Sequence, residues 1–196
     1  INGMLGLSWS RSSWENVFAR NSSFFTDFYV WHNLGAGAAT RPTVTSGDGN
    51  SSLNSYFGRL NYSFKGKYMI TGTGRIDGSS KFGENSKYGL FPSVGVAWRV
   101  SKEDFMSNIS AISNLKLRAS YGSAGNEAIG PYGSLSLANQ VDYIYGVDRI
   151  SGYSPGNTLS NPKLKWETST TLNLALDFGF FNNRLSGTIE YYDKST

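Results

Sequence analysis

Three consecutive runs of alternating apolar and polar residues, between Asn54 and Val100, constrain the fold of this chain most strongly. Successive side chains of a β-strand point to opposite faces of the sheet, so a strand with one apolar face has a period of two residues. The apolar positions of the three runs are Tyr56, Leu60, Tyr62 and Phe64; Tyr68, Ile70 and Ile76; and Tyr88, Leu90, Val94, Val96, Trp98 and Val100. The residues that alternate with them are mostly polar or small, with Phe57, Met69 and Phe91 as exceptions. The pattern predicts three neighbouring antiparallel strands that share one apolar face.

The length of these runs bears on where such a sheet can reside. Each run is about ten residues or longer, whereas strands of soluble proteins are usually about five or six residues long. A tilted strand needs about nine to eleven residues to cross a bilayer. Aromatic residues lie near the ends of the apolar face, as they do in the interfacial girdles of outer-membrane barrels. The runs therefore favour a transmembrane β-barrel over a soluble β-sandwich, which also alternates.

Composition excludes several other classes of protein. No stretch of the 196 residues approaches the roughly 18 apolar residues of a membrane-spanning helix. The formal charge is +4, and its Lys and Arg residues are scattered singly, which argues against a nucleic-acid partner. The absence of Cys excludes disulfides and thiolate metal sites, and we expect no cofactor. Because the chain begins at Ile1 without a signal peptide, we expect a mature or internal start.

The whole chain yields seven predicted strands with connections of unequal length. The strands are Asn2–Arg11, Asn54–Phe64, Tyr68–Asp77, Tyr88–Val100, Leu115–Tyr121, Leu164–Phe180 and Leu185–Tyr192. Up-and-down outer-membrane barrels have short periplasmic turns and longer external loops. By this rule the connections at 65–67, 101–113 and 181–183 are periplasmic, and those at 12–52, 77–87 and 122–162 are external.

Some local features of these connections are also predictable. The segment 12–52 is expected to be a loop with a short helix near Phe24–Leu34 and a turn at Gly47–Asn50. Ser101 is expected to cap a short helical turn. The loop from Gly122 to Pro162 is expected to hold a short hairpin around Tyr143–Ile150.

Seven strands cannot close a bacterial barrel, where the number is even and at least about eight. Open edges of lipid-facing strands are not tolerated in a bilayer. We therefore expect residues 1–196 to be an internal segment of a larger antiparallel up-and-down barrel, of the class with about 22 strands and a plugged lumen.

Several motifs, in order along nearly the whole chain, resemble the SusC/RagA family of TonB-dependent outer-membrane transporters. They are Arg75-Ile-Asp-Gly-Ser-Ser-Lys-Phe-Gly83, Phe91-Pro-Ser93 with Trp98-Arg99, Leu115-Lys-Leu-Arg-Ala-Ser-Tyr-Gly122 running to Gly125-Asn126, and Asn161-Pro-Lys-Leu-Lys-Trp-Glu167. The resemblance implies a 22-stranded barrel with an N-terminal plug, energised by the TonB complex. It also implies import of glycan oligosaccharides, with starch and malto-oligosaccharides as the substrate, captured by a SusD-like surface lipoprotein. The plug, the TonB box and the closing strands are expected to lie outside this stretch, so no residue here is assigned to energy coupling.

No group of residues has the spacing of an active site, and we expect no enzyme. His32 is the only histidine, and its neighbours offer no ligand spacing for a metal or a catalytic triad. Gly72-Thr-Gly74 lacks the third glycine of a dinucleotide-binding fingerprint. Glu167 and Asp177 are about 33 Å apart along a strand, too far for a glycosidase pair.

Binding of sugars is the chemistry that the sequence supports better. A sugar presents an apolar ring face, which stacks on aromatic rings, and hydroxyl groups, which pair with amides and carboxylates. The loop 122–162 offers both kinds of group; the candidate glycan contacts are Tyr132, Tyr143, Tyr145, Tyr153, Asn139 and Asp142, with Asn126, Gln140 and Asp148 nearby. Packing within the loop, or contact with the plug or the SusD-like lipoprotein, are alternative roles for the tyrosines.

The polar face of the strands carries five cations that are candidates for the barrel lumen, namely Arg59, Arg75, Arg99, Lys116 and Arg118. They are expected to line a solute path or to pair with acids of the plug or lumen. Taken together, the sequence predicts an internal barrel segment of an active outer-membrane transporter, in contact with outer-membrane lipid. A soluble β-sandwich carbohydrate-binding module and a passive porin segment are the alternatives.

Overall fold

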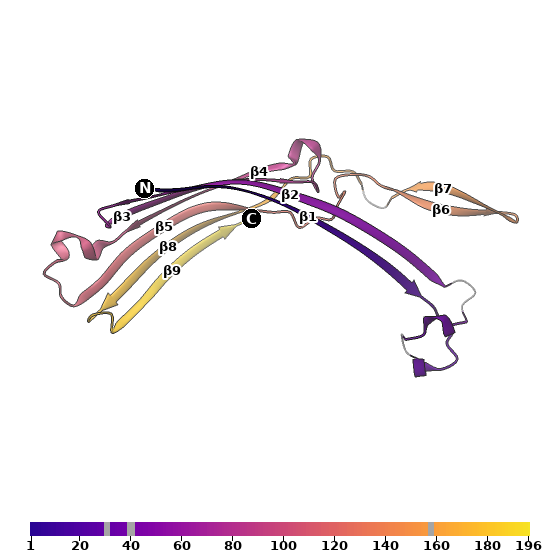
Figure 1. Cartoon of the computed structure of the whole chain (residues 1–196), viewed down its shortest axis with the longest axis horizontal. Helices are drawn as coiled ribbons and strands as arrows, with labels where there is room; N and C mark the ends of the chain where they lie inside the picture. The colour runs from indigo at the N-terminus through magenta and orange to yellow at the C-terminus, as the bar shows by residue number, and fades with distance from the viewer. Residues whose placement is uncertain (30–31, 39–41, 157–158) are drawn as a thin grey trace. The chain divides into compact units, whose positions relative to one another are not determined.

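The computed structural model describes residues 1–29, 32–38, 42–156 and 159–196, and its regular structure there is mainly antiparallel β-strand (Figure 1). A seven-stranded sheet has the order β1-β2-β3-β4-β5-β8-β9, and β6 and β7 form a separate two-stranded sheet. The strands of the large sheet are β1 (Asn2–Arg20), β2 (Thr43–Phe64), β3 (Tyr68–Ser79), β4 (Tyr88–Trp98), β5 (Ile112–Asn126), β8 (Glu167–Phe180) and β9 (Leu185–Ser195). Each strand lies beside its predecessor in the chain, apart from the excursion between β5 and β8, which confirms the predicted all-β, up-and-down antiparallel fold.

The remaining elements are short. The hairpin consists of β6 (Ala138–Tyr145) and β7 (Asp148–Pro155). The helices in the described ranges are five 3-10 turns: η1 (Asp27–Tyr29), η2 (Leu34–Ala36), η3 (Glu84–Ser86), η4 (Val100–Lys102) and η5 (Asp104–Met106). Among the residues that the structure describes, no helix is long and apolar enough to cross a membrane.

The register aligns the apolar positions of neighbouring strands into rows. One row runs through Tyr62, Ile70, Val96, Ala119, Leu174 and Tyr191, each directly opposite the next. The large side chains of this row are exposed rather than covered: Ile70 is 48% exposed, Val96 47% and Leu174 44%. A β-sandwich would bury this face against a second sheet. We call it the apolar face, and its exposure is the arrangement expected where lipid is the solvent.

The chain divides into two compact units, residues 1–10 with 52–196 and residues 11–51, and β1 and β2 run through both. In the smaller unit the Arg11 guanidinium donates a hydrogen bond to Asn50 Oδ1 at 3.4 Å. Asn21 Nδ2 donates to the carbonyls of Leu34 and Gly37 at 2.9 and 3.0 Å.

The prediction of a long loop over 12–52 was wrong at both ends. β1 continues to Arg20 and β2 begins at Thr43, so the predicted turn at Gly47–Asn50 lies inside β2. Of the predicted helix Phe24–Leu34, the described part holds only η1 and the first residue of η2, and residues 30–31 lie outside the described residues. Paired strands satisfy their backbone groups through each other, so this extension needs no apolar alternation.

Three smaller predictions also require correction. Ser101 lies inside η4, whose N-cap is Arg99 without a side-chain capping bond. β5 continues through Gly122 to Asn126, because it pairs with β8 along that whole length. Trp166 precedes β8 and is buried, whereas the alternation had placed it on the same face as Leu172.

Candidate functional site

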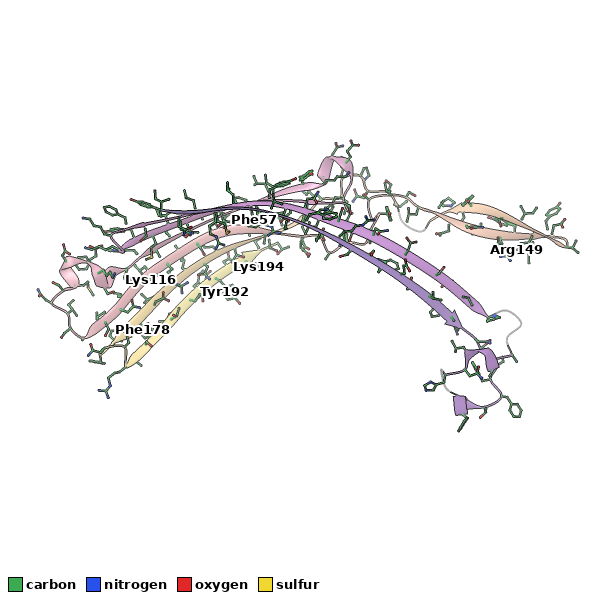
Figure 2. All side chains as sticks on the ribbon, in the orientation of Figure 1. Phe57, Lys116, Arg149, Phe178, Tyr192 and Lys194 are labelled. Atoms are coloured by element: carbon green, nitrogen blue, oxygen red, sulfur yellow. The ribbon has the colours of Figure 1, made fainter. Side chains whose placement is uncertain are left out.

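Arg75 on β3 is the centre of a polar network on the face of the sheet opposite to the apolar face. Its Nε donates to both carboxylate oxygens of Asp77, at 2.7 and 2.8 Å, and its Nη2 donates to Ser55 Oγ at 2.9 Å. The guanidinium also lies 5.8 Å from the centre of the Phe57 ring, the residue marked on β2 in Figure 2. Asp77 is 8% exposed. The charge of Arg75 is therefore neutralised within the chain.

Arg118 and Asp177 form a second network on the same face, where β5 meets β8. Arg118 Nε and Nη2 donate to the two carboxylate oxygens of Asp177, both at 2.9 Å, in a bidentate pair. Lys116 Nζ lies 4.0 Å from Asp177 Oδ2, and Thr188 Oγ1 donates to Asp177 Oδ1 at 2.9 Å. Asp177 is thus shared by two cations, and the Glu190 carboxylate on β9 also interacts electrostatically with Arg118.

Arg59 differs from Arg75 and Arg118 because it forms no ion pair within the described part of the chain. Its Nε donates a long hydrogen bond of 3.4 Å to Thr73 Oγ1, and the residue is exposed. Arg99 lies beyond the end of β4, where its backbone N–H donates to the Lys67 carbonyl at 2.8 Å. The structure therefore brings Lys116 and Arg118 together, and it places Arg99 just outside the strands that carry the other four cations.

An aromatic cluster of Phe82, Phe91 and Trp166 closes the end of the sheet from which the long connections emerge. The Trp166 ring centre lies 5.1 Å from that of Phe82 and 5.4 Å from that of Phe91, and its Nε1 donates to the Lys87 carbonyl at 3.0 Å. All three side chains are buried. Each comes from a different one of the motifs that carry the family resemblance, so these motifs mark a packing cluster.

The β6–β7 hairpin carries most of the candidate glycan contacts, but on two different faces. Opposite residues in the register share a face, so Asn139, Tyr143 and Tyr145 lie on one face, and Asp142 and Tyr153 on the other. The three tyrosines are 59%, 80% and 78% exposed in chain order. Tyr132 lies outside the hairpin, in a turn, with φ of 61°.

Asp142 is engaged within the hairpin. Arg149, marked in Figure 2, forms an ion pair with Asp142, and Ser151 Oγ donates to Asp142 Oδ1 at 2.8 Å. The hydrogen bond from Arg149, with a further one from Ser151, lowers the pKa of the Asp142 carboxyl below its ordinary value. Asp142 is therefore ionised and links the two strands of the hairpin, whereas the tyrosine rings remain accessible.

Glu103 organises the opposite end of the sheet, where the short connections lie. Its carboxylate accepts hydrogen bonds from Trp98 Nε1 at 3.0 Å, Tyr68 Oη at 2.7 Å and Lys67 Nζ at 3.0 Å. The bond from Trp98, followed by those from Tyr68 and Lys67, lowers the Glu103 pKa to about 2. The Tyr68 and Trp98 rings are stacked with centres 6.5 Å apart.

Sequence reasoning missed the aromatic cluster and the role of Glu103. The signal that could have indicated the cluster was the presence of Phe82 in an otherwise polar connection. No sequence signal links Glu103 to Tyr68, which lies 35 positions away. Across the described residues, no group of three or more His, Asp or Glu side chains is placed to hold a metal ion.

Comparison with known proteins places these features in a family. The family model described as "TonB dependent receptor-like, beta-barrel" matches residues 2–196. The chain is 39% identical over 196 residues to TonB-dependent receptor P26 of Formosa agariphila, covering 100% of this chain and 20% of that protein. It is 40% identical over 151 residues to TonB-dependent receptor SusC of Bacteroides thetaiotaomicron, covering 74% of this chain and 15% of SusC.

Solved structures agree with this assignment. The RagAB peptide importer in its "closed-closed" state superposes with a TM-score of 0.80 at 28% identity, covering 97% of this chain and 20% of that chain. The chain thus spans about a fifth or less of the length of the proteins that it matches. These matches confirm the resemblance to SusC and RagA. The chain belongs to the β-barrel family of TonB-dependent receptors, which are proteins of the bacterial outer membrane.

Proposed function

We propose that residues 1–196 form part of the barrel wall of a TonB-dependent importer that takes up glycan oligosaccharides across the outer membrane. The family membership supports import, and the motifs that resemble SusC/RagA transporters support glycans, with malto-oligosaccharides as the class that this resemblance implies. In this proposal a SusD-like lipoprotein delivers the substrate, and a plug coupled to TonB controls the lumen. The chain itself performs no covalent chemistry.

The observation that carries the proposal is the arrangement of exposed tyrosines on the β6–β7 hairpin. Tyr143 and Tyr145 lie on the same strand face, two residues apart, so their β-carbons are about 7 Å apart. Asn139 lies on that face as well. Two neighbouring rings beside an amide meet the requirement of an oligosaccharide for stacking surface and hydrogen-bonding groups.

The cations of the polar face have a complementary role in this proposal. Arg75 and Arg118 are neutralised by Asp77 and Asp177, so they stiffen the wall. Arg59 is exposed and lacks an acid partner in the described chain, so it is the cation that would meet a solute or an acidic group of the plug. An exposed guanidinium can bind a carboxylate in a bidentate manner.

Peptide import is the second candidate, because the superposed solved structures are described as a peptide importer. The polar network favours neither substrate. Tyrosine rings also stack on peptide side chains, so the two candidates must be separated by binding.

The test uses the intact receptor with Tyr143→Ala and Tyr145→Ala combined, and Tyr153→Ala as the matched control on the opposite face of the hairpin. Calorimetric titration with malto-oligosaccharides and with short peptides measures the affinity of each form. We expect the double variant to weaken malto-oligosaccharide binding, with the control unchanged and the amount of receptor in the membrane equal. Loss of peptide binding alone would support the second candidate, and unchanged affinity for both would refute a ligand-contact role for the hairpin.

A further inference from the structure

Two glycines of β3, Gly72 and Gly74, occupy positions of the apolar face where a transmembrane strand would normally carry a large side chain. A glycine inside a strand usually marks a bulge, a bend or a site of close approach by another group. The register of β3 with both neighbours is continuous through these positions, and neither glycine has positive φ. No heavy atom lies within 4 Å of the place that a β-carbon would occupy at either residue. No contact within the described chain therefore explains the small size of these two residues.

The register shows that Gly74 belongs to a row of small residues across the strands. Gly74 lies directly opposite Gly58 on β2 and Pro92 on β4. The flanking rows carry large apolar side chains on β2 and β4, with Tyr56, Ile76 and Leu90 on one side and Leu60, Val94 and Tyr121 on the other, where Gly72 occupies the β3 position. All six are exposed. The row is thus the floor of a trough with apolar walls, which we call the glycine trough.

Both ends of the glycine trough are defined. At the β2 end the Leu5 side chain comes within 3.0 Å of the β-carbon position of Gly58 and closes the trough. At the β4 end the trough leads into a pocket of about 270 Å³ lined by Pro92, Ser93, Val94, Tyr121, Ser123 and Thr170. The pocket exists because the pairing of β4 with β5 ends at Ser93 and Gly122, next to a proline that cannot donate a backbone hydrogen bond.

The chemistry of the trough changes along its length. Its floor and walls between β2 and β4 are apolar, whereas Ser123 and Thr170 place hydroxyl groups at its far end. The Ser123 hydroxyl donates a weak hydrogen bond, 3.5 Å long, to the Pro92 carbonyl, so this hydroxyl can donate to a stronger acceptor instead. In hydrocarbon an unsatisfied backbone or hydroxyl group is costly, so an occupant with its own polar atoms at this point is favoured.

We propose that the glycine trough binds one acyl chain of an outer-membrane lipid, with the ester or headgroup oxygens of that lipid at Ser123 and Thr170. The apolar face belongs to an outer-membrane barrel family, so lipid is the medium in contact with it. A flexible acyl chain fits a trough that is one row of residues wide. Because Gly58 and Gly74 have no β-carbon, the acyl chain can approach the backbone closely there and gain van der Waals contacts. A second copy of the chain would have to present a matching ridge, and Leu5 blocks the β2 end against a rigid partner.

The experiment uses the complete receptor in lipid nanodiscs that contain a phospholipid with a photoreactive diazirine on its acyl chain. After irradiation, mass spectrometry locates the cross-linked peptides. We expect cross-links to be enriched severalfold at Leu60, Ile76 and Tyr121 relative to Tyr62 and Leu185, which are also exposed on the apolar face. Uniform labelling of the apolar face would overturn the proposal.

Variants link the enrichment to the trough. Gly74→Leu should abolish the enrichment by filling the floor, and Val96→Leu, which adds the same kind of bulk outside the trough, should leave it intact. The folding of the Gly74→Leu variant is judged by its mobility shift on heating. If it does not fold, Gly74→Ala, which obstructs the trough floor less, should still reduce the enrichment. Enrichment that survives in the glycine variants would overturn the proposal. Receptor dimers in native mass spectra that are lost in the Gly74→Leu variant would also overturn it, because the occupant of the trough would then be a second copy of the receptor.

Discussion

At the scale of single residues, the environment of Glu103 shows how a turn is fixed to the sheet. Its carboxylate joins a lysine of one connection to aromatic side chains of β3 and β4. A carboxylate that accepts several hydrogen bonds is held in its charged form. The same residue therefore makes the stability of this end of the sheet depend on pH.

Glu103→Gln should remove an acid-sensitive part of that stability. The Glu103 pKa is about 2 in the folded chain against an ordinary value of 4.5, so its contribution is complete above pH 4.5 and is lost as the pH falls towards 2. We expect the melting temperature of the wild-type receptor in detergent to fall more steeply over this range than that of the variant. Asp104→Asn is the control, because Asp104 also contacts Lys67 but its side chain is exposed. Parallel acid profiles for wild type and Glu103→Gln would contradict this role.

At the scale of elements, the aromatic cluster ties the connections 80–87 and 159–166 to β4. Leu53, Ile129 and Leu164 pack against its three rings, and Lys81 Nζ lies 3.5 Å from Glu127 Oε1 beside it. Segments held by so few buried groups open together when one group is lost. The cluster is therefore the point on which the order of these connections depends.

Trp166→Ala should destabilise the cluster by about 3 to 5 kcal/mol, the usual cost of removing a buried Trp side chain. Hydrogen–deuterium exchange of the intact receptor would report the loss as faster exchange at 80–87, with β8 and β9 unchanged below the cluster. Leu135→Ala, at a half-exposed position in the neighbouring loop, is the control. Unaltered exchange in Trp166→Ala would mean that the connections are held by other contacts.

The elements also show which parts of the fold are visible in a sequence. Alternation located the strands of the apolar face, and the 65–67 turn was recognisable from a glycine between two strands, Gly66, which adopts φ of 64° in the structure. Alternation could not reveal the polar ends of β1 and β2, since strands that pair in water need no apolar face. It also misplaced Trp166, because the period of two was extended past the start of β8. The division of the hairpin tyrosines between two faces required the register, which depends on the length of its turn.

At the scale of the whole molecule, the large sheet separates two environments. The apolar face is exposed along its rows, and the opposite face carries the networks of Arg75 and Arg118. This division extends over strands that are far apart in the chain. It is the property that a wall between lipid and a polar lumen requires.

Arginine substitutions on the two faces should therefore have unequal costs. Val96→Arg places a charge on the apolar face and should lower the free energy of unfolding from lipid vesicles by about 2 to 4 kcal/mol near the middle of the bilayer. Ser93→Arg, on the opposite face of the same strand, should cost much less, because its charge can remain hydrated. Urea unfolding of the two receptors in vesicles measures both values. Equal costs would mean that the faces are wrongly assigned.

The separate pairing of β6 with β7 has a consequence for how such receptors diversify. Because these strands form a two-stranded sheet of their own in the described part of the chain, residues can be gained or lost in pairs at the tip, around Gly146 and Val147, without shifting any register of the seven-stranded sheet. The length and the surface residues of the hairpin can therefore change without a change in the strands of the barrel wall. A lineage can change what its hairpin touches while inheriting an unaltered barrel.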